Sequence, residues 1–175
     1  MKNRVLACIM IFCISMMLFS GCNSTSGTLF SPSRSQLTPE QVADKHMNAL
    51  VQYNGKELMD CWGINYSEKL NDLYDNMRNQ LSKDAPLITF SNFKYERLTG
   101  AIEQQARESL AQDWLSGKSF QSIGANVTFQ YSLSDVQEIG SVYFTTFYDG
   151  ENGGSNSISV VKTAKGWFVA SLDLY

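Results

Sequence analysis

The stretch at residues 142–175, VYFTTFYDGENGGSNSISVVKTAKGWFVASLDLY, decides the fold class. Large apolar residues alternate with other residues from Val142 to Tyr148 and again from Ile158 to Val160. Alternation with a period of two is typical of strands that bury one face. Residues 149–154 and 164–166 have the composition of turns. The stretch therefore predicts antiparallel strands joined by short turns.

Two further segments bear on the number of strands. Val127 to Leu133 also alternates, which predicts one more strand before the stretch above, and Trp167 to Tyr175 is expected to be the last one. The result is a four-stranded antiparallel meander. Residues 87–98, LITFSNFKYERL, are rich in β-forming residues, which favours a strand there without deciding it.

The first half of the body has helical patterns instead. Thr38 and Pro39 form a good helix start, and apolar residues then recur with the spacing of one helix face to residue 53. Similar patterns predict three more helices, at residues 56–62, 67–83 and 101–116. Helices followed by a sheet make an α+β fold, in which N-terminal helices pack on the apolar face of a curved antiparallel sheet.

The chain begins with MKNRVLACIMIFCISMMLFSGC at residues 1–22. Lys2 and Arg4 form a charged start, Val5 to Phe19 is an apolar run, and small residues follow, which is the pattern of a secretory signal peptide. The run is shorter than the ~20 residues needed to span a bilayer. The alternative interpretation is an N-terminal anchor that stays uncleaved.

The end of this leader, Leu18-Phe19-Ser20-Gly21-Cys22, resembles the lipobox of bacterial lipoproteins. The resemblance implies a diacylglycerol on the Cys22 thiol and cleavage just before it. We therefore expect a signal peptide at residues 1–21, a lipidated flexible tether rich in Ser, Thr, Gly and Pro at 22–37, and an α+β domain at 38–175. The lipid anchor would hold this domain on the extracytoplasmic face of the cell membrane, since several acyl chains give stable attachment.

Composition narrows the function classes. A hydrophobic content of 43% suits a folded domain and argues against disorder. The net charge of -3 becomes more negative once Lys2 and Arg4 are removed, so we expect no nucleic-acid binding. A single histidine and one cysteine outside the leader region do not give a metal-ligand cluster. We expect neither a metal nor a cofactor.

Three short segments carry a second resemblance. They are Thr38 to Val42 (TPEQV), Asn54 to Glu57 (NGKE) and Gly166 to Val169 (GWFV). Their order resembles the NTF2-like, or cystatin-like, domains of small bacterial lipoproteins, in particular the DUF4878-type secreted proteins. The resemblance implies a curved sheet wrapped on a long helix, with a pocket inside the resulting cone. Such domains include enzymes, ligand binders and dimerisation modules, so the fold alone does not choose a function.

Six residues are candidates for lining such a pocket. Aromatic side chains often line apolar cavities, and a His or Asp there could act as an acid or base; the candidates are His46, Tyr53, Asp60, Trp62, Phe129 and Tyr131. The alternatives are a structural His46, a solvated Asp60 on its helix, and aromatic residues that simply fill the core.

These observations leave three hypotheses for function. The first is a lipid-anchored domain that binds an envelope protein partner or a small apolar ligand. The second is an envelope-assembly module that forms homodimers through its sheet. The third is an enzyme of the isomerase or dehydratase kind that uses the cone pocket.

Overall fold

The computed structural model describes residues 36–81 and 87–170, and the predicted signal peptide, Cys22 and most of the predicted tether lie outside these residues. Three helices come first: α2 (Pro39–Val51), α3 (Gly55–Trp62) and α4 (Glu68–Asn79). None of the helices in the described residues is both long and apolar enough to cross a membrane.

A capping side chain stands directly before each of these three helices. The sequence predicted the caps Thr38 and Ser67, whereas Asn54 was expected only to end the preceding helix. The Thr38 side chain accepts a hydrogen bond from the Gln41 backbone N–H, while the Gln41 side chain accepts one from Thr38. At the next two helices, the Asn54 side chain accepts from the Glu57 N–H and the Ser67 side chain from the Leu70 N–H. Capping satisfies N–H groups that have no partner within the helix, so short local signals are enough to set these boundaries.

The predicted helix at residues 101–116 is two elements. An α-helix, α5 (Gly100–Ser109), continues into a single π-turn, η2 (Leu110–Trp114). The Leu115 N–H donates to the Leu110 carbonyl oxygen, a spacing of five residues. Gly117, where we expected the helical segment to end, begins another short helix, α6 (Lys118–Ser122), and a 3-10 turn, η3 (Leu133–Asp135), follows.

The sheet has four antiparallel strands whose spatial order follows the chain. They are β1 (Ile88–Arg97), β2 (Glu138–Tyr148), β3 (Glu151–Thr163) and β4 (Gly166–Val169). The predicted α+β class, with helices before an antiparallel sheet, is confirmed. The segment at residues 87–98, which the sequence left undecided, is the edge strand β1.

The predicted strand from Val127 to Leu133 is wrong. Its backbone bonds to the turn after α3 instead of the sheet: Asn65 N–H donates to the Thr128 oxygen and Gln130 N–H to the Gly63 oxygen. The segment forms one isolated bridge, Ile64 with Phe129. Its alternation is real, but its apolar side chains enter the core from outside the sheet.

Two other boundaries differ from the sequence prediction. The turn expected at residues 149–154 is only Asp149 and Gly150, since β3 already begins at Glu151. β4 ends at Val169, where a longer strand was expected, and residues 171–175 lie outside the described part. The Asp149 side chain accepts from the Leu87 N–H, so the hairpin turn is also tied to the start of β1.

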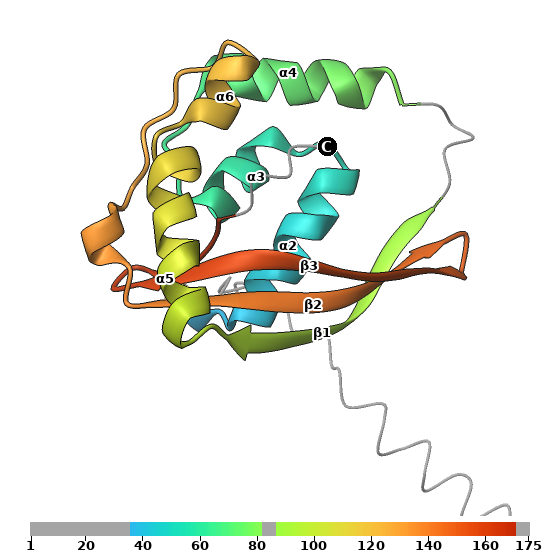
Figure 1. The fold of residues 1–175 in the computed structure, drawn as a ribbon. Coiled ribbons are helices and arrows are strands. Elements are labelled where there is room, and N and C mark those ends of the chain that lie inside the picture. Colours follow the sequence, from blue (N-terminus) through green and yellow to red (C-terminus); the bar gives the residue numbers. More distant parts are fainter. Residues whose placement is uncertain (1–35, 82–86, 171–175) are drawn as a thin grey trace, which may run out of the picture. The chain divides into compact units, whose positions relative to one another are not determined.

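The two faces of the sheet have different chemistry. On the face that we call the buried face, Val142, Val160 and Val169 are fully buried, and α2 contacts all four strands. In Figure 1, α2 passes behind the strands, while α5 lies across their other side at one end.

We call the other side of strands β1 to β3 the open face. The register and strand alternation place on it side chains that are exposed or half-buried: Thr89, Ser91, Lys94, Glu96, Ser141, Tyr143, Thr145, Phe147, Ser155, Ser157 and Ser159.

Candidate functional site

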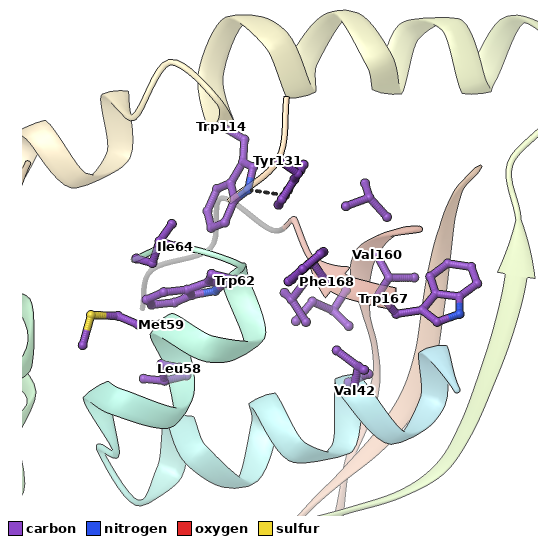
Figure 2. Packing of buried hydrophobic residues seen from close by; sticks show 14 of the residues in the cluster. Val42, Leu58, Met59, Trp62, Ile64, Trp114, Tyr131, Val160, Trp167 and Phe168 are labelled. Atoms are coloured by element: carbon purple, nitrogen blue, oxygen red, sulfur yellow. Dashed lines mark hydrogen bonds between the residues drawn. The ribbon is translucent and has the colours of Figure 1, made fainter. Parts of the chain in front are cut away.

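Three of the six predicted pocket residues lie in a packed aromatic cluster. Its members share ring contacts across α3, α4, η2, α6, the segment around residue 130 and β4; they are Trp62, Tyr74, Trp114, Phe120, Phe129, Tyr131 and Phe168. Figure 2 shows Trp62, Trp114, Tyr131 and Phe168 converging from their different elements. Trp62 is 1% exposed, so this part of the interior is filled by side chains.

A hydrogen bond fixes the middle of the cluster. Trp114 Nε1 donates to the Tyr131 hydroxyl at 3.1 Å, drawn as a dashed line in Figure 2. The Tyr131 ring stacks on Phe168 with a centroid distance of 5.0 Å. Burial raises the pKa of Tyr131, so this hydroxyl stays protonated and serves packing.

His46 lies beside the cluster, with its ring 5.7 Å from that of Trp62. It is 3% exposed, and neither ring nitrogen has a hydrogen-bond partner in the structure. Burial lowers its pKa to about 4, because desolvation disfavours the charged imidazolium. A neutral ring with neither nitrogen hydrogen-bonded lacks the partner that a proton relay needs.

The remaining two candidates lie apart from the cluster's centre. The Asp60 carboxylate is half-exposed and accepts from the Lys45 ammonium at 3.0 Å, which makes it part of a surface ion pair. Tyr53 is half-buried at the end of α2 in a left-handed conformation and packs against the edge of the core.

The structure contains a groove elsewhere, between α5 with η2 and the sheet. Its volume is about 390 Å³. The helical wall combines apolar and neutral polar residues, and consists of Ile102, Gln105, Ala106, Ser109, Leu110 and Trp114. The floor comes from the sheet, and consists of Ile139, Ser159, Val161 and Ala170. None of these ten residues has a titratable side chain in the physiological range.

The groove exists because α5 stands away from the sheet. No residue of α5 is buried, and Ile102 on its inner side is 63% exposed. Arg107 ties the helix to a neighbouring segment, since its guanidinium donates to the Val136 carbonyl oxygen at 3.1 Å; it also donates to the Glu103 carboxylate of the same helix at 2.9 Å. Val136 lies two residues before β2, so this bond connects α5 to the segment that leads into a strand of the floor.

The π-turn then anchors the far end of the helical wall. Leu110 and Trp114, four residues apart, are both buried, and each lines the groove as well as joining the core. Single π-turns are rare and often occur at functional sites. Trp114 thereby connects the packed aromatic cluster to the open space.

None of the six predicted residues lines this groove. The sequence did contain one signal for it, the stripe of Ile102, Ala106, Leu110 and Trp114 spaced by four, from which the helix at residues 101–116 was predicted. Only the last two are buried. The exposed half of the stripe forms the part of the helical wall that the sequence did not predict.

Comparison with known protein families, curated proteins and solved structures finds no match to this chain. The site must therefore be interpreted from its own chemistry. Among the residues that the structure describes, no three His, Cys, Asp or Glu side chains are grouped to hold a metal. The groove offers apolar contact, three neutral polar side chains and one indole ring.

Proposed function

We propose that this chain is a lipid-anchored, extracytoplasmic binding protein whose groove takes a small apolar ligand. The observation that carries the proposal is the groove of about 390 Å³, which is lined by seven apolar and three neutral polar residues and has no titratable side chain. Ligand pockets are typically concave, mostly apolar and equipped with a few polar groups. Acid–base catalysis needs a group that can hold or release a proton near neutral pH, and the groove has none.

The anchoring half of the proposal comes from the sequence. The charged start, apolar run and Leu18 to Cys22 ending support a lipid on Cys22. Cys22→Ala should prevent processing or release the chain from membranes, as measured by fractionation and by the mass of the product. A processed Cys22→Ala chain that stays in the membrane fraction would contradict the lipid anchor without affecting the groove.

We also propose that residues 38–175 form an NTF2-like domain. The contact of α2 with all four strands supports this, because one long helix against one face of a sheet is the arrangement that the resemblance implies. The position of the groove departs from that expectation. It lies on the face opposite α2, between α5 and the sheet, whereas the interior next to α2 and α3 is filled.

Binding in the groove can be followed through Trp114, which lines it. Bromine quenches tryptophan fluorescence at short range, so we propose a titration of the full chain in lipid nanodiscs with 10-bromodecanol. All three tryptophans are buried, but only Trp114 lines the groove, and Trp114→Phe identifies the background from Trp62 and Trp167. We expect saturable quenching in the wild type that is absent in Trp114→Phe.

A groove-filling variant provides the matched control. Ala106→Phe places a ring in the open space, and it leaves the bilayer's own uptake of the probe unchanged. We expect quenching to lose its saturable part, with circular dichroism confirming an intact fold. Equal saturable quenching in the wild type and Ala106→Phe would mean that the probe does not occupy the groove, and the proposed function would be wrong.

A further inference from the structure

The groove continues into the open face of the sheet through one residue. Ser159 forms part of the groove floor and is also the first open-face residue of β3 beside the groove. Its register partner on β2 is Ser141, which lies on the same face. A ligand whose apolar part fills the groove therefore has its other end next to these two hydroxyl groups.

Beyond Ser159, hydroxyl groups form a regular grid. The register places Ser141 opposite Ser159, Thr145 opposite Ser155, and Ser91 opposite Thr145 on the next strand. Neighbouring strands are about 4.8 Å apart, and alternate residues along a strand are about 7 Å apart. Each hydroxyl both donates and accepts, so such a grid is complementary to a ligand that also carries several hydroxyl groups.

Tyr143 provides an aromatic surface in the middle of this grid. It lies on β2 between Lys94 and Ser157 of the adjacent strands, and it is 40% exposed. Tyr has an apolar ring and a polar tip, which allows it to contact the C–H face of a sugar ring while its hydroxyl bonds to water or ligand. An exposed tyrosine among serines provides the apolar contact that hydroxyl groups alone lack.

The charge of the site favours a neutral ligand. Lys94 and Glu96 are the charged side chains that strand alternation places on the open face, and the Lys94 ammonium lies 2.7 Å from the Glu96 carboxylate. Because these two charges are paired with each other and the groove has no titratable group, the site offers no net charge to an ion.

We propose that the groove and the open face form one site for a neutral amphiphile, with its alkyl chain in the groove and a polyhydroxylated head, such as a sugar, over Ser141, Tyr143 and Ser157. This inference rests on the proposed function, since it adds the head group to the same site. The open face then binds the head group, which a sheet surface that is merely exposed to solvent would not do.

The test uses the full chain in nanodiscs with 10-bromodecanol bound, and measures how competing amphiphiles relieve the quenching of Trp114. The two competitors are n-octyl β-D-maltoside and octyl tetraethylene glycol, which share the tail and lack charge but differ in the head group. We expect the maltoside to displace the probe at a concentration about tenfold lower, which corresponds to one or two added hydrogen bonds.

Two variants at exposed tyrosines on β2 make the test specific. Tyr143→Ala should remove the advantage of the maltoside, whereas Tyr148→Ala, at a tyrosine that is 47% exposed outside the open face, should keep it. Equal displacement by both competitors, or an advantage that survives in Tyr143→Ala, would overturn the inference. In either case saturable quenching by 10-bromodecanol itself would still support the groove, so the two proposals fail separately.

Discussion

The aromatic cluster and the groove are neighbours that share Trp114, yet they differ in almost every property. In the cluster, rings from six segments fill the space at centroid distances of 5.0 to 6.3 Å. In the groove, a helix without buried residues stands beside the sheet and leaves about 390 Å³ between them. The difference shows that aromatic residues concentrated in the sequence indicate where the core is packed. Open space arises where a helix such as α5 is held away from the sheet.

The largest effect should come from the centre of the cluster. Trp62→Ala removes a side chain that is 1% exposed and contacts three other cluster rings and His46. We expect a loss of about 4 kcal/mol in the free energy of unfolding, measured by urea denaturation, since deleting a buried Trp costs both burial and a cavity. Tyr66→Ala, at a side chain that is 62% exposed, is the control and should change stability by less than about 0.5 kcal/mol. Similar losses of unfolding free energy for both variants would contradict the position of Trp62 in a packed interior.

The next effect concerns His46 and acid. Its pKa in the folded chain is about 4, below the ordinary 6.5, so the unfolded chain binds a proton first as the pH falls. Stability should therefore decrease between pH 6.5 and pH 4 by about 3 kcal/mol, with no further contribution from this group below pH 4. His46→Leu has no such proton and no unpartnered ring nitrogen, so its stability should fall less over this range.

Urea denaturation of both chains at several pH values measures this difference. Carboxylates titrate equally in the wild type and in His46→Leu, so subtracting the two curves isolates the histidine. If the free energy of unfolding depends on pH in the same way in both chains, His46 must gain a proton or a hydrogen-bond partner in the folded chain at no cost in free energy. That result would contradict its buried position without a hydrogen-bond partner.

Gly63 tests how closely the cluster is packed at its edge. Its φ of 67° favours glycine, and a Cβ at this position would overlap the ring of Phe168. Gly150 has a φ of 86° with open space around it, which makes it a matched control for the backbone conformation. We expect Gly63→Ala to lose about 2 kcal/mol more than Gly150→Ala, because overpacking is added to the same backbone strain. Equal losses of stability in the two variants would show that the Phe168 ring moves aside to accommodate the added methyl group.

The comparison also explains what the sequence could predict. Helix starts at Thr38 and Ser67 were predictable because capping depends on residues three apart. The strands from Val142 to Val160 were predictable because each pairs with its neighbour through a tight turn. Both kinds of signal are local.

The features that failed depend on distant parts of the chain. The segment around Phe129 alternates like a strand, but the turn after α3, about 65 residues earlier, takes up its backbone hydrogen bonds. The groove depends on a π-turn and on the bond from Arg107 to the Val136 carbonyl, neither of which changes the apolar pattern of the helix. Residue spacing predicted the stripe on α5 but not that half of it would remain uncovered.

The smallest effect concerns the open face, where stability and the proposed function should conflict. Ser157 lies opposite Tyr143 on an exposed strand position, and a β-branched residue beside an aromatic ring usually stabilises such a pair. Ser157→Val should therefore raise the free energy of unfolding by about 0.5 kcal/mol, measured by urea denaturation. The same variant removes a hydroxyl from the face and should reduce the advantage of octyl maltoside over its tail-matched competitor. A chain that becomes more stable while losing head-group selectivity would indicate that serine is present here for recognition. Ser157→Val with unchanged selectivity would instead make the open face an ordinary solvated surface, and the groove alone would remain as the binding site.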